Sequence, residues 1–290
     1  MNIDITALFV CLADFCHLYE MTVEKNALPL QTQRKREGIL SLSEMMLIEV
    51  LYHFSGYKAF KYFYLYHVCG SLRSLFRALP SYPRFVSIKK KLFLPLVILI
   101  HSIKGEKTGI YFADSTSLNV CKNKRIQKHQ VFRGLAKRGK TTMGWFFGLK
   151  LHLAINQKGE IMGVTLTSGN IDDRSVLPVI TEGLKGKCYA DRGYIGKTIF
   201  HKLWEKGLHL ITGIRRNMKN HLFPSIDKLW LRKRFLIETV FGVLKTDFNL
   251  EHTRHRSPSN AIVHILACVF AYIYKSNKPS IKTSFAISYP

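Results

Sequence analysis

Two kinds of hydrophobic spacing divide the chain. Residues 1–105 carry apolar side chains at helical intervals, and Ser41 followed by Glu44 has the spacing of a capping box at a helix N-terminus. From about residue 108, short apolar or alternating runs predict strands, with helical patterns between them. We therefore predict a helical N-terminal domain (1–105), an α/β domain (106–275) and a C-terminal tail (276–290).

The predicted elements of the α/β domain follow one another as strand, hairpin, helix, strand, helix, strand and helix. Asp172 and Asp173 precede the first of these helices and are interpreted as its cap. The last helical pattern runs without interruption over residues 226–246. This order and count predict an RNase H-like fold, a mixed sheet of five strands flanked by helices, with its first three strands antiparallel.

Three carboxylates stand in apolar surroundings. Asp114 and Asp191 each end an apolar strand pattern, and Glu238 lies in the long apolar helix pattern. On a helical wheel, Arg234 and Lys245 share the stripe of Glu238. Taken alone, that stripe also fits a ladder of ion pairs. Taken together, three oxygen donors from two strand ends and a helix suit a pair of Mg²⁺ ions, which would compensate a buried charge.

Such a pair of ions supports one particular chemistry. Two divalent cations roughly 3.5–4 Å apart can activate a nucleophile and neutralise the leaving oxygen of a phosphodiester. Asp14 and Glu49 also have apolar neighbours, but they lie in the helical part of the chain, away from strand ends. We therefore do not group them with the other three carboxylates.

Charge indicates the partner. The chain has 44 Lys and Arg against 19 Asp and Glu, a net charge of +25, which favours nucleic acid. A ribosome-bound protein or an anionic membrane face are the other interpretations. Residues 52–105 contain no acid, which fits either a DNA-contacting helical module or an ordinary helical cap.

Two basic segments are candidates for contact with DNA. Residues 121–140 hold eight Lys and Arg and no acid, so this segment is either a DNA-contacting linker or a solvated loop. Arg254 and Arg256 could hold phosphates or simply hydrate a connection between helices. Trp145 and Trp204 are interpreted as core residues rather than platforms for base stacking.

The cysteines and apolar runs predict a cytoplasmic location. Six cysteines lack metal-binding spacing and are interpreted as reduced thiols. Residues 1–20 lack the basic start of a signal peptide, and the apolar runs 92–100 and 261–274 are shorter than the roughly 18–20 residues of a membrane helix. We expect no membrane partner.

The motifs around the three carboxylates resemble those of DDE-type transposases of bacterial insertion sequences. The matching stretches are ADSTSLNV around Asp114, ADRGYIGK around Asp191 and RFLIETVFGVLK around Glu238. Arg234, Glu238 and Lys245 have the spacing of the signature around the catalytic glutamate of many such enzymes. That signature carries a tyrosine three residues before the arginine, where this chain has Leu231. Residues 251–274 are similar to one subfamily with short members.

The resemblance implies a metal-dependent DNA transposase with an RNase H-like catalytic domain and a DNA-binding N-terminal domain. Asp114 would bridge two Mg²⁺ ions, for which Mn²⁺ can substitute, and Asp191 and Glu238 would each hold one. Water would attack the phosphodiester at the transposon end, and the freed 3′-hydroxyl would attack target DNA.

The resemblance also implies the partners. These are double-stranded DNA, as terminal inverted repeats and as target, and further copies of the chain in a dimer or higher oligomer. The residues expected to contact DNA are Arg234, Lys245, Lys122, Lys124, Arg125, Lys128, Arg133, Lys137, Arg138, Lys140, Arg254 and Arg256. The alternatives are a catalytically inactive, nucleic-acid-binding remnant of a transposase, or a host RNase H-like nuclease.

Overall fold

Of the 290 residues of the chain, the computed structural model describes residues 3–25, 38–142, 144–214, 224–251 and 255–281. The chain divides into two compact units. We call them the helical unit, residues 1–103 and 244–274, and the sheet unit, residues 104–243 and 275–290. Residues 244–274, which the sequence assigns to the α/β domain, thus belong to the helical unit.

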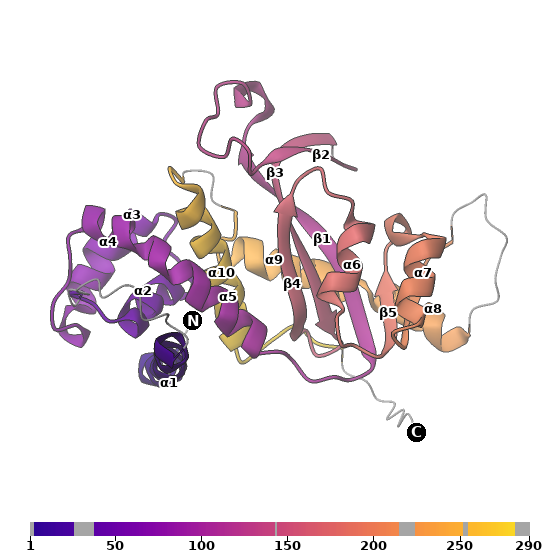
Figure 1. Cartoon of the computed structure of the whole chain (residues 1–290), viewed down its shortest axis with the longest axis horizontal. Coiled ribbons are helices and arrows are strands. Elements are labelled where there is room, and N and C mark those ends of the chain that lie inside the picture. Colours follow the sequence, from indigo (N-terminus) through magenta and orange to yellow (C-terminus); the bar gives the residue numbers. More distant parts are fainter. Residues whose placement is uncertain (1–2, 26–37, 143, 215–223, 252–254, 282–290) are drawn as a thin grey trace. The chain divides into compact units, whose positions relative to one another are not determined.

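The helical unit is assembled from apolar helices (Figure 1). Its described elements are α1 (Ile5–Lys25), α2 (Leu42–Phe54), α3 (Phe60–Tyr62), the π-helix Phe63–Ser71, the 3₁₀ turns Arg73–Leu75 and Lys89–Leu92, α4 (Tyr82–Ile88), α5 (Phe93–Ser102) and α10 (Pro258–Tyr274). The capping box predicted for α2 is present, with Glu44 N–H donating to Ser41 Oγ at 3.2 Å and Ser41 N–H donating to Glu44 Oε2 at 2.6 Å. Helix α10 joins this unit because its apolar side chains pack against α2 and α5.

Helix α1 is, among the described helices, the one long and apolar enough to cross a membrane by length and composition. Its Leu8, Leu12 and Cys16 are buried, and α1 packs against α2. Val10 and Leu18 are more than half exposed. The expected cytoplasmic location stays a prediction.

The sheet unit contains the predicted five strands and one more. Its elements are β1 (Ile110–Cys121), the 3₁₀ turn Asn123–Arg125, β2 (Lys137–Thr141), β3 (Gly144–Asn156), β4 (Ile161–Ser168), α6 (Asp173–Ile180), β5 (Gly186–Ala190), the 3₁₀ turn Arg192–Tyr194, α7 (Lys197–Trp204), β6 (Leu208–Thr212), α8 (Ser225–Lys233) and most of α9 (Phe235–Thr246).

Strand pairing follows the predicted RNase H-like pattern. Strand β3 is antiparallel to β1 and β4, and β1, β5 and β6 run parallel to one another in that order. The additional strand, β2, pairs with the first residues of β3, beside the part of β3 that pairs with β4. It lies at the end of the basic segment 121–140, which the sequence analysis interprets as a linker or a loop. The strand was not predicted because its backbone pairing with β3 does not depend on apolar alternation.

Helices cover both faces of the sheet (Figure 1). On one face, Tyr111 and Ala113 of β1 pack into an apolar core with Val176 and Leu177 of α6. On the other face, the rings of Phe112 and Tyr189 lie near Trp230 of α8. These two faces alternate along β1 and β5, as strand geometry requires.

The long helical pattern predicted over 226–246 is interrupted. Helix α8 ends at Lys233 and α9 begins at Phe235. At Arg234 the backbone makes i→i+3 hydrogen bonds on both sides, from its own N–H to Leu231 O and from Ile237 N–H to Arg234 O. At this break in the helix, the side chain of Arg234 contacts Asp114 and Glu238.

Candidate active site

The register of two parallel strands places Asp114 beside Asp191. Phe112 pairs with Tyr189 and Ala113 with Ala190, so Asp114 and Asp191 occupy the next position on each strand. Asp191 keeps an extended backbone, with φ −72° and ψ 165°, just past the end of β5. Since Phe112 and Tyr189 face α8, alternation directs both carboxylates to the same face of the sheet.

Arg234 joins the third carboxylate to this pair. Its Nη1 lies 3.0 Å from Asp114 Oδ2, and its Nη2 lies 3.0 Å from Glu238 Oε1. One guanidinium therefore bridges a strand residue and a helix residue that are 124 positions apart in sequence. Of the three carboxylates that the sequence groups together, Asp114 and Glu238 thus meet at this guanidinium, and Asp191 lies beside Asp114 on the neighbouring strand.

The three carboxylates differ in exposure and electrostatics. The side chain of Asp114 is 22% exposed, whereas that of Glu238 is 59% exposed and Asp191 is also open to solvent. Burial raises the pKa of Asp114 to about 6, and the charge of Asp191 adds to the rise. The Ser115 N–H and Arg234 act in the opposite direction. The group thus combines Asp114, a partly buried carboxylate with a raised pKa, with Asp191 and Glu238, which are exposed to solvent.

The donor set fits a divalent cation by its chemistry. Among the described residues, no three His, Cys, Asp or Glu side chains are spaced as a ready-made ion site. Instead, Arg234 supplies the positive charge between Asp114 and Glu238. Carboxylate oxygens are the ligands that Mg²⁺ and Mn²⁺ prefer, and a cation would supply the same compensation as the guanidinium.

A polar group that sequence reasoning missed lies on the opposite face of β1 and β3. Lys150 Nζ lies 2.8 Å from Asp173 Oδ1 and 3.0 Å from Ile171 O. His152 is fully buried, its Nε2 is 2.8 Å from Thr167 Oγ1, and its Nδ1 is 3.8 Å from Asp173 Oδ1. In sequence, Lys150 and His152 are the polar positions of the otherwise apolar run GLKLHLA, a signal that could have identified them.

This polar group corrects the interpretation of Asp173. Asp172 alone caps α6, by accepting from Arg174 N–H at 3.0 Å, whereas Asp173 pairs with Lys150. His152 lies opposite Ser115 in the β1–β3 register, so the group sits directly behind the strand segment that carries Asp114. Burial lowers the pKa of His152 to about 4, so its ring is neutral at physiological pH.

The basic residues expected to contact DNA are distributed over both units. The eight in segment 121–140 are all exposed on the sheet unit: Lys122, Lys124, Arg125, Lys128, Arg133, Lys137, Arg138 and Lys140. Lys245 belongs to the helical unit, where its Nζ lies 2.7 Å from Glu251 Oε1. Arg256 is exposed in the same unit, and Arg254 lies outside the described residues.

Two tryptophans contradict the sequence interpretation. Trp145 is 58% exposed and Trp204 is 51% exposed, so neither is a core residue. Trp204 stacks on His209, with ring centroids 3.9 Å apart, and on Phe200.

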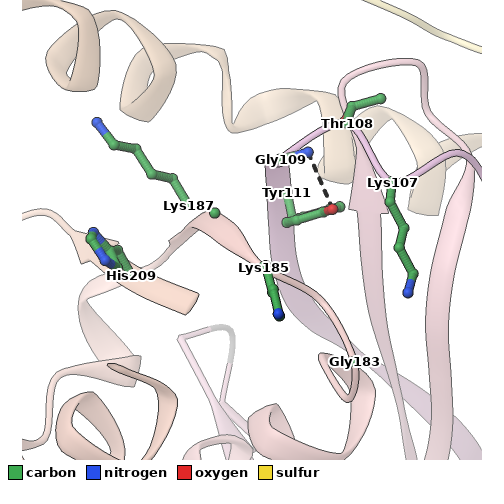
Figure 2. A pocket seen from close by; sticks show the side chains of 9 residues that line it. Lys107, Thr108, Gly109, Tyr111, Gly183, Lys185, Lys187 and His209 are labelled. Carbon is green, nitrogen blue, oxygen red and sulfur yellow. Dashed lines mark hydrogen bonds between the residues drawn. The ribbon is translucent and has the colours of Figure 1, made fainter. Parts of the chain in front are cut away.

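A cavity of about 730 Å³ opens at the other end of the parallel strands, where β1 and β5 begin. Figure 2 shows Lys107, Lys185, Lys187 and His209 around it. Lys187 is held by Asp227, with Nζ 2.9 Å from Oδ1. No carboxylate among the described residues lines this cavity, so it is separate from the group around Arg234 and is no candidate for the same chemistry.

Comparisons with known proteins agree with this architecture. Residues 104–258, more than half of the chain, match a family model described as Transposase DDE domain. No curated protein is significantly similar to the chain in sequence. Among solved structures, the cryo-EM structure of the piggyBac transposase synaptic complex with hairpin DNA aligns with a TM-score of 0.50 at 10% identity, over 94% of this chain and 75% of that chain. At that identity the likeness shows the fold alone.

A second solved structure is more distant. The crystal structure of the Mos1 mariner paired end complex with Mn aligns with a TM-score of 0.25 at 12% identity, over 92% of this chain and 96% of that chain. A similarity of that size carries no argument.

Proposed function

The chain belongs to the family of transposases with a DDE domain, and from that premise we propose that it cuts DNA at the ends of a mobile element and joins those ends to target DNA. The observation that supports the proposal is the proximity of three carboxylates: Arg234 bridges Asp114 and Glu238, and Asp191 lies beside Asp114. These are the residues that match the motifs of DDE enzymes, and they come from two strands and a helix.

Each carboxylate has a distinct part in the proposed reaction. Asp114, the most buried, would hold cations from the floor of the site, and Asp191 and Glu238 would hold them from the exposed rim. A pair of divalent cations, when bound, stabilises the attacking and leaving oxygens of the phosphodiester. Arg234 would pair with the carboxylates before the cations arrive and can then turn its fixed fork of donors to a phosphate oxygen.

The exposed cations of segment 121–140 would hold the DNA backbone beside the site. This segment carries eight positive side chains without an acidic residue. Contacts of this kind are made to phosphates and weaken as salt is raised. Since two ends of the element must be joined in one reaction, we further propose that two or more copies of the chain act together on DNA.

The proposal is tested by DNA cleavage with purified protein. The substrate carries the ends of the element that encodes this chain, in Mg²⁺ or Mn²⁺. We expect Asp191→Asn to lower cleavage at least ~10²-fold, the scale on which one electrostatic stabiliser of a transition state acts. Glu205→Gln, an exposed acid outside the site, serves as the matched control and should cleave normally.

Two results would count against the proposal. Cleavage that survives Asp191→Asn unchanged would remove Asp191 from the reaction. A clear preference for RNA–DNA hybrids over element ends would favour a host nuclease with the same fold. Filter binding without divalent cations should show equal DNA affinity for the wild type and both variants.

A further inference from the structure

Strands β2 and β3 form a two-stranded ribbon with one open face. In their register Lys140 pairs with Trp145 and Arg138 pairs with Phe147, so these four side chains share a face. Lys140 and Arg138 are exposed, and Trp145 is 58% exposed. A large aromatic side chain is therefore displayed beside the cations of β2 near the ribbon's end.

The opposite face of the ribbon is tightly packed. A Cβ on Gly139 would lie 2.1 Å from Gly169 O and 2.6 Å from the ring of Phe146, so only glycine fits there. Phe146 is 6% exposed. At the edge of β3, Asn123 Nδ2 donates to Trp145 O at 2.7 Å. The backbone that carries the indole is thus held in place, while the indole itself remains accessible.

The surroundings of Trp145 are positive and lack a ring partner. No Asp or Glu occurs between Asp114 and Glu160 in the sequence. The ammonium of Lys140 lies 5.7 Å from the centre of the indole ring. In the part of the chain that the structure describes, no aromatic ring stacks on Trp145, whereas Trp204 is already covered by His209 and Phe200.

The open face of the ribbon continues the face that carries the candidate active site. Asp114 pairs with Leu153 on β3, and Leu153 and Trp145 are eight residues apart, an even number that keeps them on one face. Eight residues of strand span about 26 Å, the length of about eight base pairs of B-form DNA.

We propose that Trp145, flanked by Lys140 and Arg138, is a stacking site for a DNA base whose face is uncovered, in a single strand or at a distorted step. The base would lie about eight base pairs from the phosphodiester at the carboxylates. Every base offers a π-face to an aromatic ring, and adjacent cations hold the phosphates on either side. This inference rests on the proposed function in one respect, that DNA is the substrate.

The first experiment measures binding of single-stranded and fully paired oligonucleotides in EDTA, where no cleavage occurs. Trp145→Ala should weaken single-strand binding about 5- to 150-fold, the range for loss of one base–aromatic stack. Trp145→Phe keeps a ring and should retain most of the affinity. Trp204→Ala is the matched control, since it removes a tryptophan that is equally exposed but already stacked, and it should bind as the wild type does.

Fluorescence gives a second readout. The chain contains three tryptophans, at positions 145, 204 and 230. Single-stranded DNA should quench the emission of the wild type and of Trp204→Phe, and this quenching should largely disappear in Trp145→Phe. Abasic sites moved along an element end should weaken wild-type binding most at the position about eight base pairs from the cut, and this maximum should vanish in Trp145→Ala.

Three results would overturn the proposal. One is unchanged single-strand affinity in Trp145→Ala. Another is a pattern in which Lys140→Gln and Arg138→Gln weaken single-strand binding and neither Trp145 variant does, which would leave phosphate contact without stacking. The third is a change in sedimentation of Trp145→Ala without DNA, which would make this face a contact between protein chains. Because binding is measured in EDTA, the effect of Trp145→Ala on DNA affinity can be determined even if the protein does not cleave DNA.

Discussion

Each of the two units contains a largely buried carboxylate, Glu49 in one and Asp114 in the other, and the two differ in their charged neighbours. In the helical unit, Glu49 is fully buried and both its oxygens meet Lys89 Nζ, at 2.8 and 3.0 Å. In the sheet unit, Asp114 shares one guanidinium with Glu238 and has Asp191 as its strand neighbour. Glu49 thus has an opposite charge of its own, whereas Asp114 shares its cation with a second carboxylate and has a third beside it.

The histidines of the helical unit follow the same logic as Glu49. His53 and His264 are buried, and their ring nitrogens meet backbone carbonyls, of Phe248 at 2.6 Å and of Asn249 at 2.9 Å. Burial lowers the pKa of His53 to about 4 and that of His264 well below its usual value. Both rings are kept neutral, and one nitrogen of each is hydrogen-bonded to the backbone, so their burial follows from the fold.

The difference between the charge partners of Glu49 and Asp114 distinguishes a structural ion pair from a candidate functional carboxylate. A buried ion is tolerated as long as its partner stays, but carboxylates that repel one another destabilise the fold that holds them. An arrangement of the second kind needs an external cation or a function to explain it, and a carboxylate with a perturbed pKa, such as Asp114, is typical of functional sites. Comparing Glu49 with Asp114 thus singles out the surroundings of Asp114 as the candidate site without reference to any motif.

The largest expected effect concerns the paired carboxylate. Glu49→Gln leaves Lys89 charged and buried without its anion, and should lower the free energy of unfolding by about 3–5 kcal/mol. Thermal or urea denaturation of the full chain measures this. Asp191→Asn is the counterpart in the sheet unit and should leave stability unchanged or higher while abolishing cleavage.

A double variant sharpens this test. Glu49→Leu with Lys89→Met replaces the pair by apolar side chains and should recover most of the lost stability. If Glu49→Gln alone costs less than about 0.5 kcal/mol, the scale of an ordinary surface change, the description of the helical unit is wrong.

The next effect is a pH dependence at Asp114. Its pKa in the folded protein is about 6, against 3.8 for a free side chain. The group therefore favours the folded state below about pH 4, and this contribution is lost as pH rises through 6. In EDTA, Asp114→Asn should gain stability over the wild type as pH rises from 4 to 7, by about 2–3 kcal/mol at most. A difference between the two proteins that stays constant over this range would contradict the assignment.

A smaller effect is expected behind the site. Asp173→Asn leaves Lys150 without its anion on the rear face of the strands that carry Asp114. Groups that support metal-binding side chains typically account for ~10–100-fold in activity or metal affinity. We expect a loss of this size in cleavage, with a higher Mn²⁺ concentration needed for half-maximal rate and with unchanged DNA affinity.

The neighbouring carboxylate provides the control for this variant. Asp172→Asn removes only an exposed ion pair with Arg174 and keeps the cap of α6, since an asparagine caps nearly as well as an aspartate. It should cleave like the wild type. Equal losses in the two variants would show that the integrity of α6, rather than the contact between Lys150 and Asp173, is what matters.

Much of this architecture follows from the sequence because its signals are local. Apolar runs that end in an acid predict both the strands and the positions of Asp114 and Asp191, and the order of elements predicts the mixed sheet. Arg234 and Glu238 are predicted on one helical stripe because their spacing is one turn. The structure places them on either side of a break that leaves this spacing intact.

The features that the sequence did not predict depend on partners distant in the chain. Strand β2 has no apolar alternation, and only pairing with β3 makes it a strand. Helix α10 joins the helical unit through packing with α2 and α5, which its own pattern cannot specify. Trp145 was assigned to the core from its residue type, but it lies on the open face of the β2–β3 ribbon.

The smallest expected effect concerns a purely local signal in the helical unit. Ser41 and Glu44 satisfy each other's backbone N–H groups at the start of α2. Ser41→Ala removes one of these acceptors and should lower the free energy of unfolding by about 1 kcal/mol. Ser41→Asp keeps an acceptor, places a negative charge at the positive end of the helix, and should cost less stability.

Because this cap is unrelated to the carboxylate site, both variants should retain wild-type cleavage at temperatures where they are folded. A loss of cleavage without loss of stability would mean that the start of α2 contributes to the reaction and that the two units are less distinct in role than their charges indicate.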